Sequence, residues 1–376
     1  MSEVRVNNLS NESNTGGPSI SGITTFSSPY FFVPPKGTTA ERPDNPQKGE
    51  LRFNTDSAKL EYFKGDTIGW VEVEASHGQL DGGARGIMGG YSISGVTIEY
   101  ITVSTLGNSA DFGDLSSGRY SGVQNCCNRT RMIWGGGYDG TGWVNIVDYV
   151  TVSSTGNAQD FGDITEKRLE VSGVNDNTRG IFAGGQHGPD HSGSNVIDYV
   201  TIAQTGNAVD FGDLVNEKST NASVSSSTRG IISYGAISPS PEATLDYITM
   251  ASTGNASSFG TLDSNNGLYA GGSSSTRGLF AGGYITNIIH YITMATTGKS
   301  TDFGDLTQAR FDGRGLSSPT RDVFVGNRAA PGSTYVNTID YVEIATTGNA
   351  VDFGDLTGDL ASNTGYAGNS NAHGGL

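Results

Sequence analysis

The sequence is poor in cysteine and has no long apolar run. Its two cysteines, Cys126 and Cys127, are adjacent, which excludes the disulfide framework of a small secreted domain. Two free thiols are the simpler interpretation, and a strained vicinal disulfide is the alternative. No apolar stretch approaches the roughly 20 residues that span a bilayer, and the first residues lack the apolar core of a secretory signal. We therefore expect no membrane insertion.

Charge is also scarce and one-sided. Only 16% of the residues are charged, and the formal net charge is −16. An acidic surface repels phosphate groups, so nucleic acid is not expected as a partner, and cationic partners or neutral sugars suit the surface better. Glycine, by contrast, is abundant, with 56 residues, about twice its usual share of roughly 7%. Because no stretch keeps a helical period, this composition indicates short strands joined by turns.

Three markers recur together along the chain. The motif "DFGDL", or a variant of it, contributes one phenylalanine to each copy, a tyrosine lies 12 residues before it, and an arginine, usually in "TRG", lies 18 or 19 residues after it. The phenylalanines, spaced 44–50 residues apart, are Phe112, Phe161, Phe211, Phe259, Phe303 and Phe353. A period of this length with four strands per copy is typical of a propeller blade, so the sequence predicts an all-β fold with a six-bladed β-propeller over residues 77–376.

Each copy reads as four short strands. An apolar run follows the arginine, a segment such as "IDYVTI" alternates with the strand period of 2, the "DFGD" segment comes third, and a strand rich in Gly and Ser comes last. One copy buries too little apolar surface to offset the ordering of its backbone, so the copies must pack on one another. The last Gly/Ser-rich strand has no copy after it. We expect it to pair with Arg85–Gly90 and close the ring; the alternative is that Trp70–Ser76 supplies that strand.

The letters "DFG" also occur in protein kinases, where the aspartate holds magnesium. Here they recur in nearly every copy without the glycine-rich loop, the strand lysine or the catalytic loop that a kinase needs. In the fourth copy Ser258 and Thr261 replace both aspartates, which would destroy a metal site but still allows turn hydrogen bonds. We therefore expect a structural motif, no enzyme activity, no catalytic residue, no cofactor and no bound metal.

The recurring arginines and aspartates suggest a repeated ion pair. Each "TRG" arginine is expected to reach a "DFGD" carboxylate of its own or the adjacent copy. The alternative is a set of solvent-facing arginines that contribute little. The candidate structural residues are Arg131, Arg179, Arg229, Asp160 and Asp210.

Length variation is confined to one part of each copy. The distance from arginine to tyrosine ranges from 14 to 20 residues, whereas the other two distances are almost constant. Surface loops vary and carry recognition while a scaffold stays fixed, so the loops between the arginine strand and the tyrosine strand are expected to form a binding face. These are the second and third strands of a copy that begins with the Gly/Ser-rich strand. The alternative is that these loops are merely permissive. The candidate contact residues are Tyr138, Trp143, His187, His191 and Tyr335; a metal site at the two histidines is not favoured, because their segment carries Gly and Pro and reads as a loop.

The front of the chain has a different composition. Residues 1–40 are mostly small and polar and cannot form a core, so they are expected to be an extended arm that becomes ordered on a neighbouring protein; the alternative is a floppy tail. Residues 41–76 contain the segments "ELRFNT", "KLEYFKG" and "WVEV", which predict a small three-stranded β-module. Three strands are marginal as an isolated unit.

Two resemblances bear on function. The paired glycines and spaced aromatics of the repeats resemble kelch propellers, and "TRGIFAGG…IDYVTIAQTGNAVDFGDL" is similar to repeats in virion structural proteins of tailed phages, particularly those of marine cyanobacteria. The segment Arg42–Val73 resembles a small module of phage tail-fibre proteins, except that Phe53 replaces the common tyrosine and "TIG" lengthens the turn before Trp70. This resemblance implies packing around a threefold axis, with Phe53, Tyr62, Phe63 and Trp70 at the contact between copies.

The resemblances imply a phage virion protein. The leading expectation is a tail-fibre-like or surface-displayed component, attached to other virion proteins through its arm and able to contact a host-surface glycan or protein through the propeller loops. The alternative is an architectural capsid-decorating or tail-adaptor protein without a receptor role. A carbohydrate-active or lectin propeller unrelated to a virion is the third interpretation.

Overall fold

The computed structural model describes residues 34–57, 59–73, 84–92, 94–120, 122–188, 190–234, 243–263, 267, 269–284, 286–329, 334–357 and 367–376. The chain divides into two compact units, Met1–His77 and Gly78–Leu376. Residues 1–33 of the arm expected over residues 1–40, and parts of two variable loops, 235–242 and 330–333, lie outside the described residues. Within the described part, no helix is long and apolar enough to cross a membrane.

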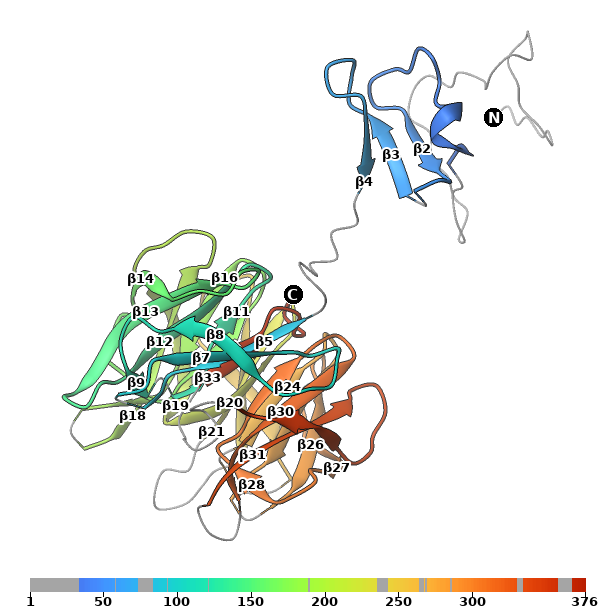
Figure 1. The fold of residues 1–376 in the computed structure, drawn as a ribbon. Coiled ribbons are helices and arrows are strands. Elements are labelled where there is room, and N and C mark those ends of the chain that lie inside the picture. Colours follow the sequence, from blue (N-terminus) through green and yellow to red (C-terminus); the bar gives the residue numbers. More distant parts are fainter. Residues whose placement is uncertain are drawn as a thin grey trace, which may run out of the picture. The chain divides into compact units, whose positions relative to one another are not determined.

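The first unit contains a four-stranded sheet with the strand order β1-β2-β3-β4 (Figure 1). Its elements are β1 (Lys36–Gly37), the 3-10 helix η1 (Thr39–Glu41), β2 (Leu51–Asn54), β3 (Lys59–Phe63) and β4 (Trp70–Val73). The three strands predicted from the sequence are confirmed, with antiparallel pairing of β2, β3 and β4. The expected strand count was wrong, because Lys36–Gly37, which the sequence analysis placed in the arm, pairs with β2 in parallel.

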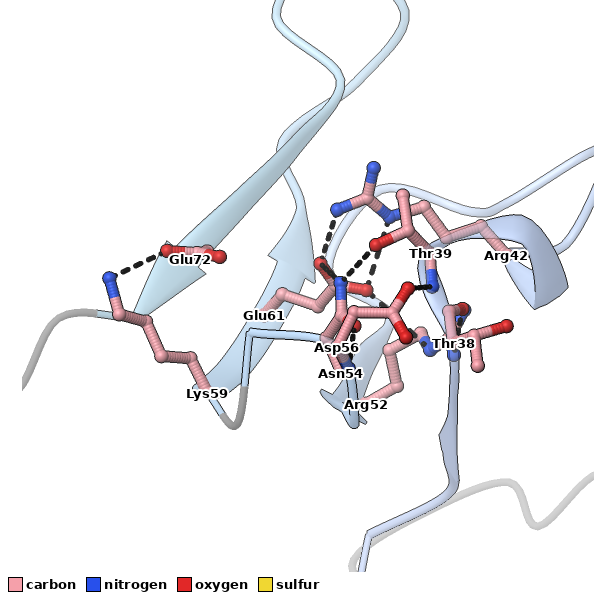
Figure 2. Close-up of polar contacts among 9 residues, drawn as sticks. All are labelled: Thr38, Thr39, Arg42, Arg52, Asn54, Asp56, Lys59, Glu61 and Glu72. Carbon is pink, nitrogen blue, oxygen red and sulfur yellow. Dashed lines mark hydrogen bonds and ion pairs between the residues drawn. The ribbon is translucent and has the colours of Figure 1, made fainter.

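A buried carboxylate explains why this arm segment folds onto the module. Glu61 is fully buried and accepts hydrogen bonds from Arg42 (2.5 Å) and Asn54 (3.2 Å), as Figure 2 shows. The hydrogen bond from the Arg42 guanidinium holds the pKa of Glu61 below its usual range. Because a buried carboxylate needs charged and polar partners, the 36–42 segment completes the module rather than extending away from it.

The two faces of the module differ in polarity. Strand register places Leu51 opposite Tyr62 and Phe53 opposite Leu60, on the face away from Glu61. Leu51 is 43% exposed, and the other three are half-buried. Phe63 and Trp70 lie opposite each other across β3 and β4 with ring centroids 5.6 Å apart, and Phe63 is buried within the unit. Of the four expected oligomer contacts, Phe53 and Tyr62 therefore lie on the open apolar face, whereas Phe63 and Trp70 pack on the other.

The second unit repeats one arrangement of four strands, and we number the repeats 1 to 6 in chain order (Figure 1). Repeat 1 consists of β33 (Ala367–Ser370), β5 (Arg85–Gly89), β7 (Thr97–Thr102) and β8 (Ala110–Asp114). Repeat 2 consists of β11 (Cys126–Cys127), β12 (Arg131–Tyr138), β13 (Trp143–Thr151) and β14 (Gln159–Asp163). Repeat 3 consists of β15 (Val171–Asn175), β16 (Arg179–Ala183), β18 (Ser192–Thr201) and β19 (Val209–Lys218).

The remaining repeats follow the same order. Repeat 4 consists of β20 (Thr220–Ser225), β21 (Arg229–Tyr234), β22 (Thr244–Thr249) and β23 (Ser257–Thr261). Repeat 5 consists of β24 (Tyr269–Ser273), β25 (Arg277–Gly282), β26 (Ile288–Thr293) and β27 (Thr301–Asp305). Repeat 6 consists of β29 (Arg314–Ser317), β30 (Arg321–Ala329), β31 (Tyr335–Glu343) and β32 (Val351–Asp355). Short strands between them are β6 (Tyr91–Ser92), β9 (Arg119–Tyr120), β10 (Gly122–Gln124), β17 (Gln186–His187) and β28 (Arg310–Phe311).

The core lies between neighbouring repeats. In each repeat the motif phenylalanine is buried, and the marker tyrosine meets it edge to face with ring centroids 5.7–6.1 Å apart. Phe211 of repeat 3, for example, shares a cluster with Val174 and Ile181 of its own repeat and with Ile232 and Ile248 of repeat 4. A single sheet therefore does not enclose its own core, as expected from the small size of one copy.

The C-terminal strand pairs with the first repeat. β33 is antiparallel to β5, with Gly368 opposite Met88, which confirms the pairing expected from the sequence. The first strands of the repeats, with β10 just before β11 in repeat 2, contact one another in the order β10, β15, β20, β24, β29 and β33, and β33 contacts β10 again. The second unit is therefore an all-β structure of many antiparallel sheets, consistent with a β-propeller-like fold.

Candidate functional site

Each antiparallel sheet has two distinct ends. At the turn end, the first strand turns into the second and the third into the fourth. At the loop end, the second strand leads into the third, and the chain enters the first strand of the repeat. Because β10 runs parallel to both β15 and β33, corresponding ends of these strands point the same way. The described parts of the variable loops lie at the loop end.

The "DFGD" motif joins neighbouring repeats at the turn end. The Gly254 N–H of repeat 4 donates to the Phe211 carbonyl of repeat 3 (2.7 Å), and the Ala256 N–H donates to the Asp213 carbonyl (2.7 Å). The same pair of bonds occurs at every junction, including that of repeats 6 and 1, where Gly107 donates to Phe353 and Ser109 to Asp355, both at 3.0 Å. The structural role predicted for the motif is confirmed, although backbone carbonyls, rather than aspartate side chains, accept these bonds.

The predicted pairing of "TRG" arginines with "DFGD" aspartates was wrong. Within the described residues, Arg131, Arg179 and Arg229 make no ion pair with Asp160 or Asp210, whose side chains are exposed. Each "TRG" guanidinium instead lies over the marker tyrosine, 4.3–5.1 Å from the ring centroid. Its Nη1 donates to a backbone carbonyl of the next repeat, as at Met250, and from repeat 6 to Val103 of repeat 1. For Arg131, Arg179 and Arg229 a tyrosine face and a carbonyl satisfy the cation without a carboxylate. Arg321 also pairs with Glu343 of its own repeat (3.0 Å).

This arrangement predicts unequal effects for two substitutions in repeat 3. Arg179→Leu loses a contact with Tyr199 and a hydrogen bond to Met250, so we expect the free energy of unfolding to fall by about 1–2 kcal/mol. Asp210→Asn changes only an exposed side chain and is expected to stay within about 0.5 kcal/mol of the parent. Urea unfolding of the three proteins measures both effects, and equal losses would restore the ion-pair interpretation.

Buried ion pairs do occur at the loop end, between other residues. Arg168 Nη2 lies 2.6 Å from Asp198 Oδ1, and both side chains are fully buried. The same pair is repeated twice more, as Arg119–Asp148 (2.8 Å) and Arg310–Asp340 (3.0 Å). In each case the arginine lies in the segment just before the first strand of a repeat. The aspartate lies on the third strand of the same repeat. These pairs therefore fix the chain at the point where it approaches the loop end.

Four of the five predicted contact residues lie in repeats 2 and 3. The rings of Trp143 in repeat 2 and His191 in repeat 3 contact each other, with centroids 5.3 Å apart and nearly perpendicular planes. Tyr138 lies opposite Trp143 in the β12–β13 hairpin, and its hydroxyl donates to the Gly140 carbonyl (3.2 Å). His187 is exposed on β17. Among the described residues, no group of three or more His, Cys, Asp or Glu side chains is arranged to hold a metal.

The fifth residue, Tyr335, belongs to a separate aromatic group in repeats 5 and 6. Its ring centroid lies 5.9 Å from the Arg328 guanidinium, which lies at the same distance from Phe311. Phe311 in turn contacts Tyr284, with ring centroids 5.5 Å apart. Phe311 is buried, whereas Tyr284 is 55% and Tyr335 44% exposed. Two large aromatic surfaces are therefore open to solvent at this part of the loop end.

One carboxyl group adjoins each of these regions. Glu170 precedes β15 in repeat 3, and Asp312 precedes β29 in repeat 6. Burial raises the pKa of Glu170 to about 7, and repulsion by Asp312 adds to this rise. Burial also raises the pKa of Asp312, against the attraction of Arg314 and Arg328. Both residues have left-handed backbone, with φ of 56° and 59°, which is uncommon for residues other than glycine and often marks functional sites.

A sequence signal marks these residues, although none of them was among the predicted site residues. Arg119, Arg168 and Arg310 each lie seven residues after a motif phenylalanine. In two of these copies an acidic residue follows two positions later, giving "RLE" before β15 and "RFD" before β29. Aligning the copies on phenylalanine would have shown both patterns. It would not have shown that the charges of Glu170 and Asp312 interact, because that depends on how repeats 3 and 6 face each other.

The turn end is closed by the C-terminal residues. His373 is buried, and its Nε2 lies 2.8 Å from the Cys127 carbonyl of repeat 2, while its Nδ1 accepts from the Gly375 N–H (3.0 Å). The Gly374 N–H donates to the Ser273 carbonyl of repeat 5 (2.9 Å). A neutral imidazole with its proton on Nε2 satisfies both contacts of the histidine. Residues 371–376 thus tie together the first strands of several repeats.

His373 gives the fold a specific pH dependence. Desolvation lowers its pKa from 6.5 to about 4, so the unfolded chain binds a proton that the folded chain excludes over this range. Stability should therefore fall as pH falls from about 6.5 to about 4, by about 2 kcal/mol between pH 7 and pH 5. Unfolding of the parent and His373→Gln at both pH values tests this. The variant should lose that part of the pH dependence, and equal slopes would contradict the assignment.

The adjacent cysteines are free thiols, which confirms the simpler interpretation of the sequence. Both are fully buried, and desolvation raises the pKa of each thiol. Cys126 packs in the core with Phe182 and Val200, and Cys127 packs in the neighbouring cluster with Met132. They therefore act as small core residues rather than as nucleophiles.

No protein-family model matches the sequence, and no curated protein is similar to it at a significant level.

Proposed function

We propose that residues 84–376 form a six-bladed β-propeller and that the chain is a structural protein displayed on the surface of a tailed-phage particle, where its loop end contacts the host. The blade count is supported by six strand sets in one order and by junction bonds that continue from repeat 6 to repeat 1. The virion assignment is supported by the resemblance of the repeats and of Arg42–Val73 to phage structural proteins.

The observation that carries the host-contact role is the difference between the two ends of the sheets. The turn end shows almost no length variation and contains the buried residues around His373. The loop end contains all the length variation, and it exposes Tyr284 and Tyr335. Exposed aromatic side chains on variable loops favour recognition of another molecule over a purely internal role.

The module is proposed to join copies of the chain into a homotrimer, with the arm attached to other virion proteins. One face of the module's sheet is apolar, which favours its burial against another surface. This face consists of Leu51, Phe53, Leu60 and Tyr62. Light scattering of the full chain should give a trimer. Tyr62→Glu should give monomers, whereas Glu72→Gln, on the opposite face, should remain trimeric. A monomeric parent would contradict the trimer proposal.

Location in the particle tests the host-contact role. Electron microscopy of intact particles labelled with an antibody to residues 84–376 should place the propeller at the periphery, with the loop end accessible. The purified full chain should also bind host cells and compete with infection. Symmetric burial of the loop end against neighbouring virion proteins, with no binding to cells, would instead support the architectural alternative.

A further inference from the structure

We propose that the loop end carries a single extended binding track for a neutral oligosaccharide, running from Trp143 and His191 through Glu170 and Asp312 to Arg328 and Tyr335. This inference rests on the proposed host-contact role and names the class of ligand for it. The track combines two aromatic ends with a polar centre, and its members come from repeats 2, 3 and 6.

The first half of the track is a continuous chain of contacts. The Gln186 Nε2 donates to Glu170 Oε2 (2.7 Å), and the Gln186 Oε1 lies 3.0 Å from His191 Nδ1. His191 then meets the Trp143 ring. Gln186 thus holds the carboxyl group and the imidazole in fixed positions. The backbone of His191 is also left-handed, with φ of 56°, so the three described non-glycine residues with positive φ all belong to the track.

The second half joins Asp312 to the aromatic group of repeats 5 and 6. Asp312 follows Phe311, whose ring contacts Arg328, and the charge of Arg328 attracts the Asp312 carboxylate. Arg314 Nη1 donates to the Asp312 carbonyl (2.9 Å), which holds the backbone at this point. Tyr335 lies at the far end, beside Arg328. Glu170 and Asp312 occupy corresponding positions at the loop end of the first strands β15 and β29, which belong to one closed series of strand contacts, and the charge of Asp312 acts on Glu170.

The chemistry of the track selects the ligand. The two carboxyl groups, with their raised pKa values, do not outweigh the two guanidinium groups of Arg314 and Arg328, although the chain as a whole carries −16. Such a centre repels a polyanion less than the rest of the surface but gives a strong cation no net attraction. Sugar hydroxyls both donate and accept hydrogen bonds, so they can pair with carboxylates, amide and arginines alike. Their apolar C–H faces suit Trp143 at one end and Tyr335 at the other.

Binding of defined oligosaccharides to the full-length chain tests the proposal. The probes are immobilised hexamers of glucose, galactose and mannose, with polygalacturonate as an anionic contrast. At least one neutral hexamer should bind the parent. Trp143→Ala, Tyr335→Ala and Glu170→Gln should each weaken that binding about tenfold or more, because each removes a stacking face or a charged acceptor. Val351→Ala, an exposed residue on the outer strand β32, is the matched control and should bind like the parent.

The outcomes separate this inference from the proposed function. Unchanged melting temperatures must accompany the losses, so that a folding defect is not mistaken for a binding defect. Binding of polygalacturonate alone, no binding of any hexamer, or parent-like binding by all three track variants would overturn the oligosaccharide assignment. If host cells still bind the parent in that case and bind Tyr335→Ala less, the partner is a protein and the host-contact role stands. Loss of both kinds of binding would remove the proposed function as well.

Discussion

Gly212→Ala should lower the free energy of unfolding by about 4 kcal/mol, because it combines backbone strain and overpacking of about 1–3 kcal/mol each. Gly212 has a φ of 148°, which disfavours any side chain. A Cβ at this position would also lie 2.5 Å from the carbonyl carbon and oxygen of Gly254 in the next repeat. Since the Gly254 N–H donates to Phe211, the substitution forces apart a junction that recurs around the whole structure.

Gly254→Ala is a matched control for this prediction. Gly254 has nearly the same φ, 151°, but a Cβ there would meet nothing within 4 Å. It therefore carries the strain without the collision, and we expect a loss of about 1–3 kcal/mol. Guanidinium unfolding of both variants measures the difference. Equal losses would mean that the close approach of repeats 3 and 4 does not stabilise the fold.

Asp198→Ala is expected to cost about 3–5 kcal/mol, because it leaves the fully buried Arg168 guanidinium without its carboxylate. The Thr165 hydroxyl and N–H also lose their acceptor. Asp210→Ala is the control: Asp210 lies directly opposite Asp198 on β19, but its side chain is exposed, so the change should stay within about 0.5 kcal/mol.

A double substitution distinguishes two causes of the instability: loss of the ion pair and the presence of an unpaired buried guanidinium. If the cost arises from the unpaired guanidinium, Arg168→Met combined with Asp198→Leu should recover most of the stability, since an apolar pair has no charge to desolvate. Chemical unfolding of the single and double variants gives the comparison. A double variant as unstable as Asp198→Ala would assign the loss to packing or to Thr165 instead.

The repeating architecture could be predicted because it depends on short-range pattern. The phenylalanine, tyrosine and arginine markers keep their spacing, and the strand pairings follow from alternation and turns within each copy. The partner of the C-terminal strand could be predicted for a similar reason. The sheet of repeat 1 has one strand too few in sequence order, and Ala367–Ser370 was left without a neighbour.

Other features depend on which side chains become buried, and the spacing of residues does not reveal that. Arg179 and Arg168 are both arginines near a motif, yet the first lies over Tyr199 and the second forms an ion pair. The choice of Asp198 over Asp210 follows from burial: the two residues lie directly opposite each other, but Asp198 on the third strand is buried, whereas Asp210 on the outer strand is exposed. Likewise, the sequence shows that Glu61 is charged but not that it is buried. Its burial explains why β1 joins the module.

The central claim is that the six repeats close into a ring, and amide hydrogen exchange tests it most directly. At the closing junction the Gly107 and Ser109 amides donate to Phe353 and Asp355, just as Gly254 and Ala256 donate at the junction of repeats 3 and 4. Closure predicts that these four amides of the unmodified chain exchange with similar, slow rates. Rapid exchange at Gly107 and Ser109 beside slow exchange at Gly254 and Ala256 would show an open array and contradict the account.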